Sequence, residues 1–131
     1  MGRAFYDRIA KQWHDATGYH GGPFKRYVLN DFLLNKIASI KDRSILELGA
    51  GNGYFLSLLN RRYSGQQPKL VVVTDISNAL LSIAQQEFRI ANADYLQLDI
   101  SRPFPFMESS FDLIIATMVF NEIDTKGLKL A

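Results

Sequence analysis

Three glycines stand at alternate positions, Gly49, Gly51 and Gly53, directly after an apolar run and directly before a helix-like stretch. Such a turn lets backbone N–H groups and a helix N-terminus approach a ligand, because no Cβ atom stands in the way. The dinucleotide fingerprint Gly-x-Gly-x-x-Gly would need its third glycine at position 54, which is Tyr54 here. The loop instead fits Gly-x-Gly-x-Gly, with an acid, Glu47, two positions upstream. This spacing predicts a ligand-binding turn between a buried strand and a helix.

Two aspartates follow later apolar runs and are further candidates for ligand contacts. Asp75 comes directly after residues 71–74, and Asp99 directly after residues 96–98. A carboxylate can accept two neighbouring hydrogen bonds, and ligands of parallel sheets bind outside the carboxyl ends of the strands. Each aspartate also has a structural interpretation. Asp75 could cap a helix beginning near Ser77, and Asp99 could be a turn residue before Ser101.

The apolar runs that carry these residues are short, as buried strands are. They alternate with two stretches of helical spacing, Tyr54 to Arg62 and Asn78 to Phe88. Strands that are apolar on both faces and alternate with helices indicate parallel strands buried between helix layers, so the predicted class is α/β. The predicted strands are Ser44 to Leu48, Leu70 to Thr74, Tyr95 to Leu98 and Leu113 to Thr117.

The first forty residues have helical rather than strand periodicity. One set of apolar positions predicts a first helix around residues 5–13, and a second set predicts another helix: Val28, Phe32, Leu33, Ile37 and Ile40. Between them, residues 17–23 contain three glycines and one proline, which favours a mobile surface segment. The polar side chains in and beside this segment are candidates for an acceptor site, with a solvated role as the alternative: His14, Asp15, Tyr19 and His20.

Composition narrows the class of protein. The 131 residues carry 15 Lys and Arg against 13 Asp and Glu, a formal net charge of +2 that gives no support for nucleic acid or for a polybasic membrane patch. The sequence has no cysteine and two histidines, so we expect no disulfide and no metal site. The apolar stretch 113–120 is too short to span a bilayer, and we expect a cytoplasmic protein without membrane contact.

The stretch Leu46 to Gly53 resembles the first motif of the class I S-adenosylmethionine-dependent methyltransferases, which places an acid two residues before Gly-x-Gly-x-Gly. Asp75 and Asp99 resemble the acids that follow the second and third strands of that family. Residues 103–115, with Pro-Phe-Pro-Phe and then Ser-Phe-Asp-Leu-Ile-Ile, resemble the signature that leads into its fourth strand. Four motifs in the family's order are more specific than the glycine loop alone.

The resemblance implies a Rossmann-like, doubly wound parallel sheet in the order 3-2-1-4, with S-adenosyl-L-methionine as cofactor. It implies that Asp75 binds the ribose hydroxyls, that Asp99 lies near the adenine amino group between Ile76 and Ile100, and that Glu47 meets the methionine amino group through the loop or a water. The residues implied to bind the cofactor are Glu47, Gly49, Ala50, Gly51, Gly53, Asp75, Ile76, Asp99, Ile100 and Thr117.

The resemblance implies no particular catalytic side chain. Asn121 and Glu122 resemble the polar pair often found beside the transferred methyl group, and the segment around Tyr6 resembles a lid over the cofactor, with simple packing as the alternative role of Tyr6. The implied reaction transfers a methyl group to an N, O or C nucleophile of a small-molecule acceptor that the sequence does not identify.

We expect one incomplete domain over residues 1–131, with an N-terminal helical lid segment at 1–40 and a cofactor-binding α/β part at 44–131. A complete domain of the family continues with further strands, so the fourth strand would here form an exposed apolar edge. Such an edge favours self-association.

Two alternatives remain at this point. A Rossmann-type oxidoreductase that binds NAD is weakened by Tyr54 in place of the third glycine. A binding or assembly module that keeps the fold without turning over fits the sequence equally well. Binding of NAD would identify the first, and a reading frame that continues past Ala131 would argue against the second.

Overall fold

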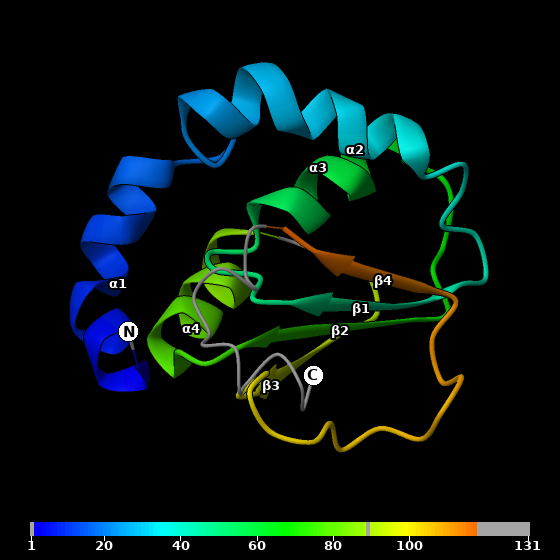
Figure 1. The fold of residues 1–131 in the computed structure, drawn as a ribbon. Coiled ribbons are helices and arrows are strands. Elements are labelled where there is room, and N and C mark those ends of the chain that lie inside the picture. The colour runs from blue at the N-terminus through cyan, green and yellow to red at the C-terminus, as the bar shows by residue number, and fades with distance from the viewer. Residues whose placement is uncertain (1, 89, 118–131) are drawn as a thin grey trace.

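The computed structural model describes residues 2–88 and 90–117. Its centre is a parallel sheet with the strand order β3-β2-β1-β4 (Figure 1). The predicted α/β class and the predicted order 3-2-1-4 are both confirmed. The strands are β1 Ser44–Leu48, β2 Leu70–Asp75, β3 Ala93–Gln97 and β4 Leu113–Ala116.

The helices cover one face of this sheet and the carboxyl ends of its strands. Helix α3 connects β1 to β2, helix α4 connects β2 to β3, and α1 lies beyond the arrowheads of the strands beside α4 (Figure 1). No helix in the described part of the chain is long and apolar enough to cross a membrane. The helices are α1 Arg3–Thr17, the π-helical turn η1 Lys25–Leu29, α2 Asn30–Lys36, α3 Tyr54–Arg62 and α4 Asn78–Glu87.

The second N-terminal helix differs from its prediction in two ways. It ends at Lys36, and Ile37 has extended backbone angles, although Ile37 and Ile40 are buried. Val28 and Phe32 do not face the core, since each is 59% exposed. Helical spacing predicted the element correctly, but it did not show where the helix ends or which of its apolar side chains face the core.

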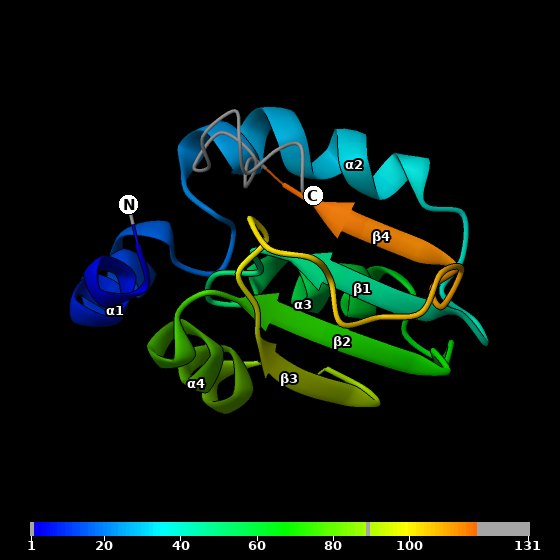
Figure 2. The same ribbon diagram turned by 60° about the horizontal axis from the view of Figure 1, so that its bottom comes forward.

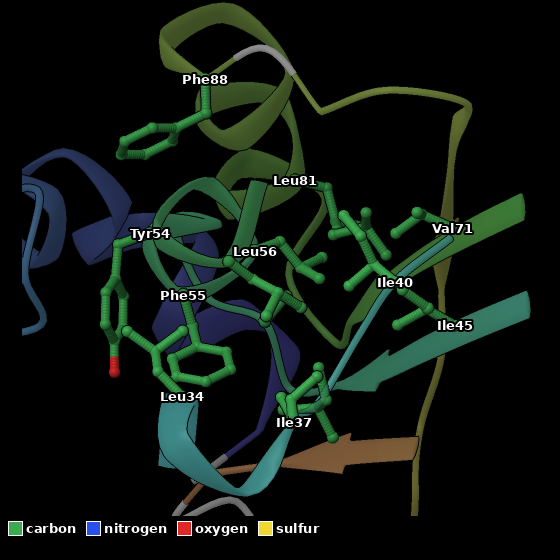
Figure 3. Close-up of a cluster of buried hydrophobic side chains, with 14 residues drawn as sticks. Leu34, Ile37, Ile40, Ile45, Tyr54, Phe55, Leu56, Val71, Leu81 and Phe88 are labelled. Carbon is green, nitrogen blue, oxygen red and sulfur yellow. The ribbon is translucent and has the colours of Figure 1, made fainter. Parts of the chain in front are cut away.

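Successive side chains of the strands point to opposite faces of the sheet and belong to two apolar clusters, one on each face. The larger cluster packs Ile45, Val71 and Ile115 of the strands against α3, α4 and the end of α2 (Figure 3). Phe55 of α3 is fully buried at its centre. Because three strands and three helices meet in this cluster, it fixes the carboxyl ends of β1 and β2 relative to the helices that start there.

The opposite face is covered by a connection instead of a helix. Figure 2 shows the segment between β3 and β4 crossing in front of β1 and β2. The apolar side chains of this segment pack on Leu46, Leu48 and Val72 of the strands. These side chains are Leu98, Ile100, Phe104, Phe106 and Phe111. On the same face of β4, Ile114 is 59% exposed.

Helix α3 begins at a glycine that no other residue can replace without cost. Gly53, the N-cap of α3, has φ +84°, and a Cβ atom added there would lie 2.8 Å from Cβ of Ala84 in α4. The backbone is left-handed at this point, and α4 packs against it too closely for a side chain.

Gly53→Ala should therefore lower the free energy of unfolding by about 2–4 kcal/mol, since it combines left-handed strain with overpacking. Urea unfolding followed by circular dichroism measures this loss. Gly65→Ala is the matched control, because Gly65 is also left-handed, at φ +94°, but nothing lies within 4 Å of its added Cβ atom. Equal losses in the two variants would show that the contact with α4 is not responsible.

Strand β4 supplies a second prediction. It pairs with β1 on one side and with no other strand among the described residues on its other side, and Ile114 adds an exposed apolar side chain. We expect the 131-residue chain to self-associate, with an average mass in light scattering that rises with concentration. Ile114→Lys should reduce the rise, whereas Phe32→Lys, at an equally exposed position on α2, should not. A monodisperse monomer at high concentration would contradict the expectation.

Candidate functional site

The glycine loop after β1 has the left-handed backbone that its composition predicted. Gly49, Gly51 and Gly53 have φ angles of +63°, +60° and +84°. The loop is fastened to β2, because the Ala50 amide donates a 2.8 Å hydrogen bond to the Thr74 carbonyl. Backbone amides of residues 49–53 are thus held at the carboxyl edge of the sheet, directly before α3.

Asp75 connects this loop to the loop after β2. Its Oδ2 accepts a 2.8 Å hydrogen bond from the Gly51 amide, and its Oδ1 accepts a 2.9 Å bond from the Ser77 amide. Burial raises the pKa of the Asp75 carboxyl, while the bonds from Ser77 and Gly51 lower it. Asp75 is not the N-cap of α4, since the Ser77 hydroxyl accepts from the Leu80 amide in that role.

Glu47 is buried at the carboxyl end of β1, one residue before the strand ends. The residue is 1% exposed, and its Oε2 has no hydrogen-bond partner in the described part of the chain. Burial raises the pKa of Glu47 to about 8, with Lys25 lowering it and Asp75 raising it. With a pKa of about 8, this buried acid is mostly protonated at neutral pH.

The residues predicted to surround the adenine ring take part in a turn and in the packing of the fold. Asp99 Oδ1 accepts bonds from the Ser101 amide at 2.9 Å and from the Ser101 hydroxyl at 2.6 Å, and its Oδ2 lies 3.5 Å from Nε of Arg102. Asp99 thus forms the turn that was its alternative interpretation. Ile100 is buried in the cluster opposite α3, and Ile76 is half-buried beside α1 and α4.

Thr117 follows β4 and is the last described residue. It is buried, and its side chain lies close enough to the Tyr54 hydroxyl to oppose the upward shift that burial gives the pKa of Tyr54. Thr117, Tyr54 and Glu47 therefore gather at the carboxyl ends of β1 and β4. The predicted residues Asn121 and Glu122 lie outside the described residues.

Helix α1 is attached to the site by Asp7, a residue that the sequence did not single out. Asp7 Oδ1 accepts a 2.6 Å bond from the Ser77 hydroxyl and a 3.1 Å bond from the Ala79 amide at the start of α4. These bonds hold the pKa of Asp7 below its usual value. Tyr6 packs next to Asp7 in an apolar cluster with Leu80, which agrees with the packing role given as its alternative.

The other end of α1 is attached by Asn52, which is buried inside the glycine loop. Asn52 Nδ2 donates to the Gly18 carbonyl at 2.8 Å and lies 2.9 Å from His14 Nδ1, which must then act as an acceptor. Asn30 Nδ2 donates a 2.9 Å bond to the carbonyl of His20. The turn at 17–23, predicted to be mobile, is therefore tied to the glycine loop through Gly18 and to α2 through His20.

The remaining polar candidates from the N-terminal segment are not gathered into one cluster. Tyr19 packs edge-on against Phe88 and His14, and Asp15 pairs with Lys11 at the surface at 2.7 Å. Within residues 2–88 and 90–117, no group of three or more His, Cys, Asp or Glu side chains could hold a metal ion. The arrangement at the carboxyl edge is thus a set of backbone amides flanked by buried acids.

Comparisons with known structures agree with this fold. Phosphoethanolamine N-methyltransferase 1 from Haemonchus contortus, solved with phosphoethanolamine and S-adenosylhomocysteine, has a TM-score of 0.70 at 15% identity, over 95% of this chain and 26% of that one. A chain of the Haloferax volcanii complex that contains the Trm112 methyltransferase activator has a TM-score of 0.68 at 19% identity, over 92% and 48%. Magnesium protoporphyrin IX methyltransferase from Synechocystis PCC 6803, solved with S-adenosylhomocysteine, has a TM-score of 0.64 at 16% identity, over 90% and 57%.

These likenesses show a shared fold, and the chain spans about half the length of the second and third of these structures and about a quarter of the first. No curated protein sequence matches the chain. The sequence profile described as "Methyltransferase domain" matches residues 45–131, which is most of the chain and includes both the glycine loop and Asp75. The chain therefore belongs to the methyltransferase domain family, with the fold of the class I, S-adenosylmethionine-dependent methyltransferases.

Proposed function

We propose that this chain binds S-adenosyl-L-methionine at the carboxyl edge of its sheet and transfers the methyl group of that cofactor to a small-molecule acceptor. One observation carries the proposal: a loop with three left-handed glycines lies between two buried acids, Glu47 and Asp75, in a chain of the methyltransferase domain family.

The residues fit the cofactor in charge and in hydrogen-bonding capacity. Asp75 uses one acceptor site on each oxygen for Gly51 and Ser77, and the further lone pairs of both oxygens suit the two hydroxyls of a ribose. The orphaned Oε2 of Glu47 suits an ammonium group. The full proposed set is Glu47, Gly49, Ala50, Gly51, Gly53, Asp75, Ile76, Asp99, Ile100 and Thr117.

The members of this set have unequal support. Asp75, Glu47 and the glycines face one another, so they form the centre of the proposal. Asp99 has its Oδ1 occupied by Ser101, and only the Oδ2 that lies near Arg102 remains for a ligand. Ile100 belongs to the core and Ile76 to the contact with α1, so their proposed contact with an adenine ring is the weakest part of the set.

The chemistry needs little from the protein beyond alignment. The bound cofactor supplies a methyl group on a positively charged sulfur, which a nucleophile can displace in line. The protein's task is then to hold donor and acceptor together, and a general base is needed only where the acceptor must lose a proton. The acceptors named for two relatives, phosphoethanolamine and magnesium protoporphyrin IX, are both small molecules but differ greatly in size. We therefore propose a small-molecule acceptor without choosing one.

Calorimetric titration with S-adenosylhomocysteine tests the proposal directly. The wild-type chain should bind it, and Asp75→Ala should weaken binding about 100-fold or more, since two hydrogen bonds to a charged group are lost. Asp94→Ala is the matched control, because Asp94 is an exposed acid on β3 of the same sheet and should leave the affinity unchanged. NAD should not bind.

Each outcome has a definite meaning. Binding of NAD in place of S-adenosylhomocysteine would favour the oxidoreductase alternative. A folded chain that binds neither ligand would overturn the proposal and leave the non-catalytic module as the better description.

Glu47 gives a second test through its proton. With a pKa of about 8, the free carboxyl is mostly protonated at pH 7, and an ammonium group beside it would stabilise the ionised form. Binding of S-adenosylhomocysteine at pH 7 should therefore release close to one proton. Calorimetry in phosphate and in Tris buffer measures this release from the difference between the two binding enthalpies. The same release from Glu47→Gln would show that the proton comes from another group.

A further inference from the structure

A lysine from the N-terminal segment reaches into the site. Lys25 begins the π-helical turn η1, and its Nζ lies 5.4 Å from the centre of the Tyr54 ring. The contact is tight, because a Cβ atom added at Gly21 would lie 2.5 Å from Cζ of Tyr54 and 2.8 Å from Cδ of Lys25. The absence of a side chain at Gly21 thus lets the lysine stem and the tyrosine ring pack closely beside the turn.

The ammonium group of Lys25 lacks an acidic partner at contact distance. No carboxylate in the described part of the chain forms an ion pair with it, whereas Lys11 on α1 pairs with Asp15 at 2.7 Å. The acid whose charge acts on Lys25 is Glu47, and the two groups interact electrostatically without forming an ion-pair contact. A half-buried ammonium group without an ion-pair partner lowers the stability of the fold unless a negatively charged group neutralises it.

The acid that acts on Lys25 also has a buried oxygen without a partner. Oε2 of Glu47 is buried and forms no hydrogen bond within the described residues. Glu47 therefore offers a carboxyl group and Lys25 an ammonium group, close enough for each to act on the charge of the other. This combination is complementary to a small group that carries both charges, such as the ammonium and carboxylate of a free α-amino acid.

We propose that Lys25 binds the α-carboxylate of the cofactor's methionine end, opposite Glu47 on its α-ammonium, so that the two residues together select a zwitterion. The inference rests on the proposed function, since it concerns the same ligand. It assigns to the N-terminal segment a direct part in binding, in addition to covering the site. It also explains why the turn before Lys25 contains Gly21, where any side chain would displace both Tyr54 and Lys25.

The test compares S-adenosylhomocysteine with its decarboxylated analogue, which keeps the ammonium group and lacks only the carboxylate. The wild-type chain should prefer the intact ligand by about 10- to 100-fold, the value of a hydrogen bond between charged groups. Lys25→Gln should bind both ligands with similar affinity. Lys25→Arg should retain the preference, since it restores the cation.

Lys36→Gln is the matched control. Lys36 lies 5.2 Å from the Phe32 ring on the exposed face of α2, so its loss removes a comparable lysine–aromatic contact away from the site. This variant should discriminate between the two ligands as the wild type does. Circular dichroism of each variant checks that it is folded.

The outcomes separate this inference from the proposed function. If the wild type binds S-adenosylhomocysteine and Lys25→Gln keeps its preference for the carboxylate, the role of Lys25 is wrong and the proposed function stands. If the wild type binds both ligands equally, no residue of the chain recognises the carboxylate. The role of Lys25 is then also wrong, and the proposed function stands. If the wild type does not bind S-adenosylhomocysteine, the proposed function falls and the inference falls with it.

Discussion

The carboxylate of Asp75 is the interaction on which the rest of the site depends. It ends β2, accepts the Gly51 amide from the loop after β1, and accepts the Ser77 amide from the loop before α4. Parallel pairing of β1 with β2 brings these loops to one edge, and the carboxylate fixes the distance between them. Ser77 then serves as the cap of α4 and as a donor to Asp7, so the position of α1 depends on the same bond.

A second constraint is electrostatic, because Glu47 and Asp75 are both buried at this edge. Two ionised carboxylates in such a place would repel each other, and burial disfavours the charge of each. Burial raises the pKa of both acids, that of Glu47 to about 8, while the backbone amides of Ser77 and Gly51 oppose the rise at Asp75. The two acids therefore differ in what stabilises their charge: Asp75 accepts two backbone amides, whereas Oε2 of Glu47 has no hydrogen-bond partner among the described residues.

The parts of the site that follow one another in sequence were predictable, and the parts that meet only in the fold were not. The strands and the glycine loop could be predicted because their signal lies within a few consecutive residues, and Asp75 follows its strand directly. Asp7 and Asn52 gave no comparable signal, since their partners lie about 70 and 35 residues away. Phe32, which is exposed, shows a different limit, since helical spacing predicts a helix without showing which apolar side chains meet the core.

The two ends of α1 are held to the site with unequal strength. Breaking the contacts of Asp7 returns a carboxylate to water, where solvent replaces the lost donors. Breaking the contacts of Asn52 leaves its buried amide without a partner inside the glycine loop. An unpaired buried polar group lowers the stability of the fold by about 1–3 kcal/mol. The C-terminal end of α1 and the turn that follows it are therefore the firmer attachment. Since that turn leads directly into Lys25, the glycine loop helps to fix the position of the N-terminal segment where it packs on Tyr54.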